Sequence, residues 1–321
     1  MKEICIKKDY LRDLLLYPLN YGESGEEVNR EPGKCNAFNY RKNNVNPVYI
    51  MQHHTVSDYD RTIKIFTEQV VSAHYIIDKE GVVQELVLPE YRAYHAGKGS
   101  IIEGSILNSG ILAGEFKTDM NSKSIGIENV NSGNEEFSDN QILANIFLCQ
   151  KLSQDYNSIK SELMLGHSDW AIGRKIDPSI FFPWELFANA KEVYENEGIT
   201  TNFGKYPNKK DFNLKQSPDV VLSYDKFKKN EVLKEDVQEI QEQFRDLGYD
   251  IPDNELGTVS TRTQDAILAF RIHYAGDDIA KHQKSVWEDL CIDSENYGAR
   301  SEICQFTEND VESMENLLDQ F

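Results

Sequence analysis

The stretch PVYIMQHHT, residues 47–55, decides the fold of the first part of this chain. It is a short apolar run that ends in polar residues, which is the pattern of a buried strand with polar side chains at its C-terminal end. The residues that follow, DRTIKIFTEQVV (60–71), show helical spacing of apolar side chains. The next stretch, AHYIIDKEGVVQELV (73–87), has two β-rich runs around a Lys-Glu-Gly turn and predicts a hairpin.

The alternation of strands and helices continues beyond the hairpin. KSIGIENV (123–130) reads as another short strand, and residues 138–156 carry a strong amphipathic stripe with Ser138 as an N-cap candidate. Residues 181–198 predict a helix that is entered through Pro183. Strands interleaved with helices indicate an α/β domain with a central mixed β-sheet flanked by helices.

Changes in composition suggest the domain limits. Residues 1–46 are rich in Asn, Gly, Glu and Pro, and we expect an irregular lead-in packed on the α/β domain of residues 47–200. Residues 201–231 are polar and aperiodic, which is typical of a linker. Residues 232–321 predict a small C-terminal three-helix domain, interrupted by an insertion at about 276–304.

Three amphipathic patterns predict the helices of the C-terminal domain. The first has apolar residues spaced by three and four and ends at Gly248. The second has Thr261 or Thr263 near its N-cap. The third has Thr307 as N-cap, with acidic residues in its first turn.

Charge and length restrict the class of protein. The chain has 321 residues and a formal net charge of −20, so its surface repels nucleic acid phosphates and anionic lipid. No apolar run approaches the length that spans a bilayer, and no signal peptide is visible in the chain as it stands. Five cysteines match no metal-binding spacing. Cys291 and Cys304 could pair in an oxidising compartment, whereas free thiols are expected in a reducing one.

The stretch LGHSDWAIGRKIDP (165–178) has almost no apolar periodicity, yet it holds His167, Lys175 and Asp177. A catalytic zinc needs about three protein ligands from histidine and carboxylate or thiolate. One histidine of the pair at 53–54, together with His167 and Asp177, would supply such a set. Spacing alone does not choose between the paired histidines, and it leaves satisfied core or surface histidines as the alternative.

The motifs QHHT, SAHYIID-EG, YHAG, SIGIEN and GHSDWAIGRKIDPS-FFPW occur in the order found in zinc-dependent N-acetylmuramoyl-L-alanine amidases. Residues 45–190 therefore resemble this family, which includes the peptidoglycan-recognition proteins. The last motif is the most specific, because its His, Lys, Asp-Pro and Pro-Trp all agree. Residues 232–321 resemble the peptidoglycan-binding module of one branch of the family. The chain departs from that branch in the 276–304 insertion, in its long lead-in and in showing no lipoprotein signal.

The resemblance implies one zinc ion per chain, with His53, His167 and Asp177 as its ligands. His53 is preferred to His54 because the family's ligand stands two places before the Thr that follows this strand. Adjacent strand residues point to opposite faces, so His54 is expected to face away from the metal, in the core or behind the ligands.

The resemblance also implies that Glu128 is the catalytic acid/base and that Lys175 stabilises the oxyanion. A carboxylate near a zinc-activated water suits proton transfer, and an ammonium beside the metal suits the developing negative charge. The simpler interpretations are a solvated glutamate and a surface lysine. Trp170 and Trp184 are interpreted as packing residues.

Further side chains are candidates for supporting the ligands or contacting substrate. His74 and His95 match family histidines that line the cleft, where they orient ligands, touch substrate or only pack. Asp169 is expected to support His167, because a metal-bound histidine usually donates its other N–H to an oxygen.

The resemblance therefore implies hydrolysis of the amide bond between the lactyl group of N-acetylmuramic acid, or its 1,6-anhydro form, and L-alanine of the stem peptide. The alternatives are a non-catalytic peptidoglycan receptor on the same fold and an unrelated metallopeptidase. The expected partners are peptidoglycan or muropeptides, with no nucleic acid and no membrane span; a monomer is plausible. Without a visible signal peptide a cytoplasmic location is predicted, whereas the wall-binding module favours the periplasm or cell envelope.

Overall fold

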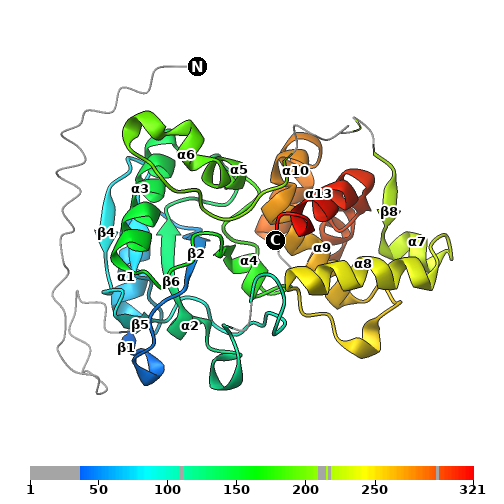
Figure 1. Cartoon of the computed structure of the whole chain (residues 1–321). Helices are drawn as coiled ribbons and strands as arrows, with labels where there is room; N and C mark the ends of the chain where they lie inside the picture. Colours follow the sequence, from blue (N-terminus) through cyan, green and yellow to red (C-terminus); the bar gives the residue numbers. More distant parts are fainter. Residues whose placement is uncertain (1–36, 109–110, 209–214, 216–217, 294–295) are drawn as a thin grey trace.

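The computed structural model describes residues 37–108, 111–208, 215, 218–293 and 296–321. Figure 1 shows two regions side by side, one around a sheet and one of helices. In chain order the sheet region comes first, and the helical region, here the C-terminal region, comes second.

A mixed five-stranded sheet lies in the first region, in the order β4-β3-β6-β2-β7. Its strands are β2 (Tyr49–His54), β3 (Tyr75–Ile77), β4 (Val83–Glu85), β6 (Ser124–Asn129) and β7 (Met164–Gly166). β2 runs parallel to β6 and β7, β3 runs parallel to β6, and β4 is antiparallel to β3. The predicted mixed sheet, its first strand and the hairpin are confirmed.

Helices α1 (Tyr59–Glu68) and α3 (Asp139–Asp155) lie beside this sheet (Figure 1). Ser138 is the N-cap of α3, as predicted, and its hydroxyl accepts a hydrogen bond from the Gln141 N–H. On the buried side of α3, Asn145 Nδ2 donates to Gln52 Oε1 of β2 at 2.8 Å. The same Gln52 oxygen accepts from Asn129 of β6 at 3.1 Å, so this polar contact ties α3 to both central strands.

The end of the expected irregular lead-in is ordered. β1 (Phe38–Tyr40) pairs antiparallel with β5 (Tyr91–Ala93), and the short helix η1 (Lys42–Asn44) follows β1. Between them Arg41 is buried, and its guanidinium donates to carbonyls that include those of Pro89 and Ser124. Residues 1–36 lie outside the described residues, and with them the expectation that they pack on the domain.

Two short elements, η2 (Gly114–Phe116) and α2 (Met120–Lys123), precede β6. Residues 181–198 do not form the single helix that was predicted. They form α5 (Trp184–Ala188), α6 (Ala190–Val193) and η3 (Glu195–Glu197). The break is at Asn189, whose backbone is non-helical and whose side chain donates to the Glu185 carbonyl at 2.8 Å. Asparagine competes in this way for helix carbonyls.

The helices predicted for the C-terminal region are α8 (Lys234–Leu247), α9 (Thr261–Tyr274) and α13 (Glu308–Leu318). Gly248 ends α8 with a φ of 142°, which favours glycine. Thr307 caps α13 as predicted. The N-cap of α9 is Ser260 rather than a threonine, because the Ser260 hydroxyl accepts from the Thr263 N–H.

The expected insertion and linker both contain regular structure. Residues 276–304 hold α10 (Gly276–His282), α11 (Lys284–Ile292) and α12 (Tyr297–Ile303). Residues 201–231 hold β8 (Val220–Leu222) and α7 (Tyr224–Lys228). Outside this segment, the short 3-10 helix η5 (Asp253–Glu255) follows α8. β8 pairs with β9 (Phe306–Thr307), so part of the predicted linker belongs to the C-terminal region.

One hydrophobic core runs through both regions. The same cluster of buried side chains includes Ile50 and Phe187 of the first region and Phe244 and Trp287 of the second. A β-bridge between Ile101 and Tyr249 also joins the two regions. The C-terminal region is therefore packed against the sheet domain rather than tethered to it. Trp170 and Trp184 are buried in this core, as expected of packing residues.

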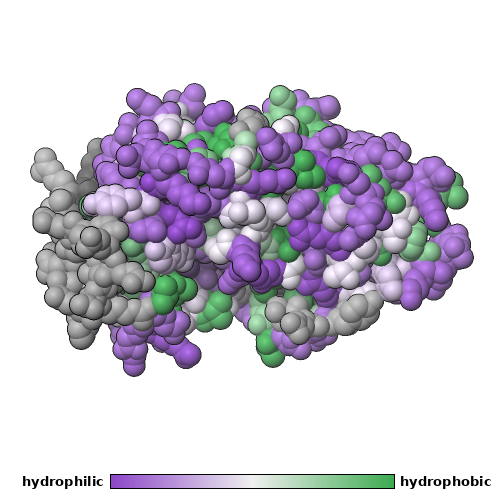
Figure 2. Space-filling view, turned by 90° about the horizontal axis from the view of Figure 1, so that it is seen from below, coloured by the Kyte–Doolittle hydropathy of each residue, from purple (hydrophilic) through white to green (hydrophobic). Residues whose placement is uncertain are grey.

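Cys149, Cys291 and Cys304 are free thiols, so the possible pairing of Cys291 with Cys304 is not made. The face of the molecule in Figure 2 is mostly hydrophilic, with hydrophobic residues in small scattered groups. Across the part of the chain that the structure describes, no helix combines the length and apolarity needed to cross a membrane.

Candidate metal centre and active site

The neighbouring strands β6, β2 and β7 bring the site residues together near their C-terminal ends. His53 of β2 is in register with Glu128 of β6. On the other side of β2, Gln52 pairs with Gly166 of β7, so the next residue, His167, follows beside His53. Paired residues of adjacent strands point to the same face, which places Glu128 and His53 on one side of the sheet. Asp177 joins them from the loop that follows α4 (His167–Trp170).

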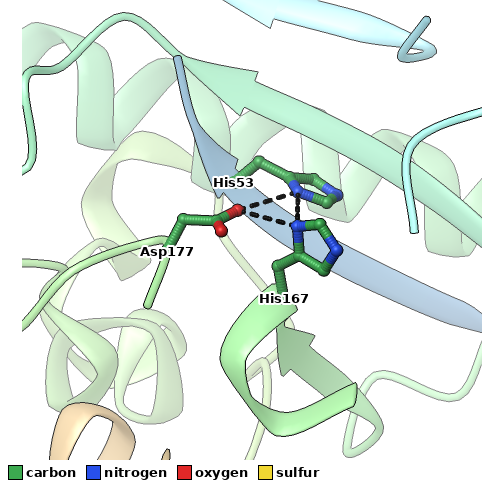
Figure 3. Close-up of side chains that lie close together, drawn as sticks. All are labelled: His53, His167 and Asp177. Carbon is green, nitrogen blue, oxygen red and sulfur yellow. Dashed lines mark hydrogen bonds and ion pairs between the residues drawn. The ribbon is translucent and has the colours of Figure 1, made fainter. Parts of the chain in front are cut away.

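His53, His167 and Asp177 point toward one another (Figure 3). The two Nδ1 atoms are 3.0 Å apart, and each is 3.0 Å from Asp177 Oδ2. All three residues are buried, and among the described residues they are the one group of three with the arrangement of a metal site. The structure thus selects His53 rather than His54 and brings together the three predicted ligands.

Hydrogen bonds on the far side of each imidazole leave Nδ1 free to bind a metal. His167 Nε2 donates to the Ala96 carbonyl at 2.8 Å. His53 Nε2 donates to His95 Nδ1 at 3.0 Å, which requires His95 to carry its proton on Nε2. That nitrogen lies 3.3 Å from Ser124 Oγ, and the Ser124 hydroxyl in turn donates to Met120 O at 2.7 Å. Such partners fix the tautomer and orientation of a ligand.

The charges of the cluster suit metal binding as well. Burial raises the pKa of Asp177, but the adjacent His167 and His53 outweigh this effect and hold it well below its usual range. Burial, assisted by His167, lowers the pKa of His53 to about 4. Asp177 is therefore a carboxylate and His53 a neutral imidazole at neutral pH, the forms in which they bind metal ions.

Glu128 is partly exposed, but its Oε2 is buried and has no hydrogen-bond partner among the described residues. Burial, and then the charge of Asp177, raise the pKa of Glu128 to about 8. The ammonium of Lys175 acts in the opposite direction on Glu128, and it lowers the pKa of His53. Lys175 therefore lies close enough to the cluster for its positive charge to change the pKa of Glu128 and of His53.

His54 and His74 do not join the cluster. The ring of His54 packs on Gly133, where a Cβ would approach it to 2.8 Å, and its Nδ1 is buried without a partner among the described residues. His74 Nδ1 accepts from the Gly126 N–H at 2.9 Å, and its Nε2 lies 3.1 Å from Tyr91 O. Nε2 of this fully buried ring also lies 3.1 Å from the Arg41 guanidinium, so both nitrogens are occupied away from the cluster.

The expected contact between Asp169 and His167 is not formed, because the His167 N–H donates to the Ala96 carbonyl instead. Asp169 Oδ2 instead accepts from the Gly166 N–H and from His273 Nδ1, both at 2.7 Å. Its Oδ1 accepts from the Tyr249 hydroxyl at 2.8 Å. Asp169 therefore contacts the C-terminal region rather than the metal ligands.

Ser124 and Gly126, which were not predicted as site residues, share a face of β6 with Glu128. Ser124 supports His95, and a Cβ on Gly126 would lie 2.5 Å from His95 Cγ, so glycine makes room for that ring. The period of two along SIGIEN is the signal that could have identified them.

Residues 43–180 match the family model described as N-acetylmuramoyl-L-alanine amidase. The chain is 31% identical over 152 residues to the N-acetylmuramoyl-L-alanine amidase AmiD of Escherichia coli strain K12, which is 42% of this chain and 50% of that protein. It is 29% identical over 120 residues to the 1,6-anhydro-N-acetylmuramyl-L-alanine amidase AmpD of Haemophilus influenzae, 37% of this chain and 58% of that one. The chain thus spans about half the length of the curated relatives it matches.

Solved structures show the same fold over most of the chain. A complex of E. coli AmiD with anhydro-N-acetylmuramic acid-L-Ala-D-γ-Glu-L-Lys has a TM-score of 0.56 at 21% identity, covering 86% of this chain and 90% of that one. The structure of AmpDh3 from Pseudomonas aeruginosa has a TM-score of 0.54 at 21% identity. The match covers 94% of this chain and 99% of that one. Both likenesses extend well beyond residues 43–180, into the C-terminal helices.

Proposed function

Because residues 43–180 match the family model of N-acetylmuramoyl-L-alanine amidases, we propose that this chain is a zinc-dependent amidase of peptidoglycan. It hydrolyses the amide bond between the lactyl group of N-acetylmuramic acid, or of its 1,6-anhydro form, and L-alanine of the stem peptide. The observation that supports this most directly is the convergence of His53, His167 and Asp177 beside Glu128, whose Oε2 has no hydrogen-bond partner in the described part of the chain.

The three converging side chains fit zinc. Two imidazoles and one carboxylate are a donor set of catalytic zinc sites, which leave a position open. Three atoms at the corners of a triangle of side 3.0 Å can each lie about 2.0 Å from one point, about 1 Å above their plane. That is the usual distance of nitrogen and oxygen ligands from zinc. When bound, the ion supplies Lewis acidity for the carbonyl and lowers the pKa of water.

Glu128 acts as general base and then as general acid. Its unpartnered Oε2 accepts a proton from the attacking water and later donates it to the nitrogen of the leaving L-alanine. A pKa of about 8 in the metal-free site suits both directions of transfer near neutral pH. The ammonium of Lys175 stabilises the oxyanion of the tetrahedral intermediate.

The alternative is a non-catalytic peptidoglycan receptor on the same fold. A receptor needs no proton acceptor at the site, and burying a carboxyl oxygen without a partner costs free energy. The retained ligand set and the position of Glu128 therefore favour the enzyme.

The ligands of two solved relatives support the proposed substrate class. The E. coli AmiD structure holds an anhydro-muramoyl tripeptide, and a structure of the P. aeruginosa protein holds an anhydromuramic pentapeptide. We propose that this chain accepts anhydro-muropeptides, in cell-wall turnover or recycling. Binding of peptidoglycan by residues 232–321 and the cytoplasmic location stay predictions.

The test incubates purified full-length protein with anhydro-muropeptides and with intact sacculi, and reads the products by mass spectrometry. The samples are the wild type, the chelator-treated protein with and without added zinc, Glu128→Gln, and the exposed control Glu103→Gln. Release of free stem peptide with an intact N-terminal alanine is expected for the wild type, the zinc-restored sample and the control only. A folded, zinc-loaded protein that binds sacculi but releases no peptide would exclude the amidase and leave the receptor.

A further inference from the structure

The C-terminal region contacts the short helix that carries a metal ligand. Asp169 lies in α4, two residues after His167, and is fully buried. Its carboxylate accepts three hydrogen bonds: from the Gly166 N–H at 2.7 Å, from His273 Nδ1 at 2.7 Å and from the Tyr249 hydroxyl at 2.8 Å. Two of these three donors belong to the C-terminal region, one following α8 and one in α9.

The hydrogen bond that the Gly166 N–H donates to Asp169 closes the first turn of α4 immediately before His167. α4 has only four residues, and so short a helix has little stability of its own. Its geometry therefore depends on contacts made by its side chains. A buried carboxylate with all its donors present is stable in one orientation, whereas loss of a donor leaves part of its charge unpaired.

The donors from the C-terminal region are themselves held in place. The His273 ring lies between two other rings, with centroid distances of 3.7 Å to Trp184 and 4.0 Å to Tyr274. Tyr249 is 1% exposed, and its backbone forms the β-bridge to Ile101. Both donors thus approach Asp169 from fixed directions.

The 276–304 segment makes a second contact, with the loop that follows Glu128. Trp287 of α11 is fully buried, and its Nε1 donates to the Gly133 carbonyl at 2.9 Å. The same carbonyl accepts from Ser179 Oγ at 2.8 Å. Ser179 follows the ligand Asp177 by two residues, and Gly133 lies in the loop after the strand that ends near Glu128. The Ser179 hydroxyl thus joins the loop that carries Asp177 to the loop that follows Glu128, and the Trp287 indole of the C-terminal region donates to the carbonyl at which the two loops meet.

We propose that the C-terminal region is a positioning element of the metal centre. Tyr249 and His273 orient Asp169, and through it the start of α4 and His167. Trp287 fixes the Gly133 carbonyl, to which the loop of Asp177 is bonded through Ser179. This role is distinct from binding peptidoglycan, and it gives the 276–304 segment a function. It rests on the proposed function only in taking His53, His167 and Asp177 as the metal ligands.

The test measures zinc affinity of the full-length chain by competition with a chromophoric chelator, together with kcat and KM. Tyr249→Phe keeps the ring and removes one donor to Asp169. Tyr49→Phe is the matched control, because the Tyr49 hydroxyl is equally buried and donates to Leu107 O at 2.9 Å, away from the site. Tyr249→Phe is expected to weaken zinc binding about 10-fold and lower kcat, with KM unchanged, while Tyr49→Phe binds zinc as the wild type does.

A second pair of variants separates positioning from packing. His273→Leu and His273→Asn both remove the ring that stacks on Trp184, but asparagine retains an N–H close to the position of Nδ1. His273→Asn is expected to bind zinc several-fold more tightly than His273→Leu at equal thermal stability. Should both histidine variants unfold, Tyr249→Phe and its control decide the question alone.

The outcomes are distinguishable from failure of the proposed function. Equal zinc affinity of wild type and Tyr249→Phe, with no difference between the two His273 variants, overturns the positioning role even if the wild type hydrolyses muropeptides. A wild type that binds zinc but hydrolyses nothing overturns the amidase, and the zinc affinities still decide the positioning role.

Discussion

Replacing Glu128 by Gln should change the stability of the metal-free protein in a pH-dependent manner. Burial and the charge of Asp177 raise the pKa of Glu128 from the ordinary 4.5 to about 8. The folded protein therefore binds this proton more tightly than the unfolded chain does. The resulting stabilisation is fully present below about pH 4.5 and is lost as the pH rises through about 8. Glutamine does not titrate, so the variant does not suffer this loss.

The size of the effect follows from the shift. A change from 4.5 to about 8 is about 3.5 pKa units, and at about 1.4 kcal/mol per unit the upper limit is about 5 kcal/mol. The side chain is partly exposed, so solvent screening reduces the effect, and we expect about 2 kcal/mol. Relative to wild type, Glu128→Gln should gain this stability progressively between about pH 4.5 and pH 8.

The assay is urea denaturation of chelator-treated wild type, Glu128→Gln and Glu103→Gln at a series of pH values from about 4.5 to 9. Glu103 is an exposed glutamate and should follow the wild type throughout. Adding zinc should reduce the advantage of Glu128→Gln, because a nearby cation favours the carboxylate. If the difference in free energy of unfolding between Glu128→Gln and wild type stays constant across this pH range, the reasoning is refuted, because Glu128 then does not keep its proton up to about pH 8.

Three further predictions concern the surroundings of the cluster. Lys175→Met should lower kcat about 100-fold and leave zinc content unchanged, measured by steady-state kinetics and metal analysis; an unchanged kcat would remove Lys175 from the mechanism. His95→Leu should weaken zinc binding about 10-fold or more in chelator competition, because His53 loses its acceptor. Gly126→Ala should destabilise the protein by about 1–3 kcal/mol in denaturant unfolding, because its Cβ meets the His95 ring, whereas Gly298→Ala, with room for a Cβ, should not.

Local patterns determined much of the fold. The apolar runs around residues 49–54 and 124–129 form strands as predicted, because alternation and β-branched composition act within a few residues. Ser138 and Thr307 begin helices for the same reason, since a cap bonds to a backbone N–H three residues away. Prediction fails in two places. Asn189 interrupts a helix through its own bond to the Glu185 carbonyl, which outweighs the apolar pattern, and β8 forms in a predicted linker because it pairs with the distant β9.

The sequence by itself also narrowed the site to a few polar residues, through motifs that resemble one family. Only the tertiary structure decided which of them meet. His53 and His54 are adjacent and point to opposite faces, so the register of β2 with β6 and β7 determines which one lies beside Glu128 and His167. The partners of Asp169 could not be predicted, because Tyr249 and His273 are 80 and 104 residues away along the chain. Contacts at such separations depend on how two regions pack into one core, and no local pattern encodes them.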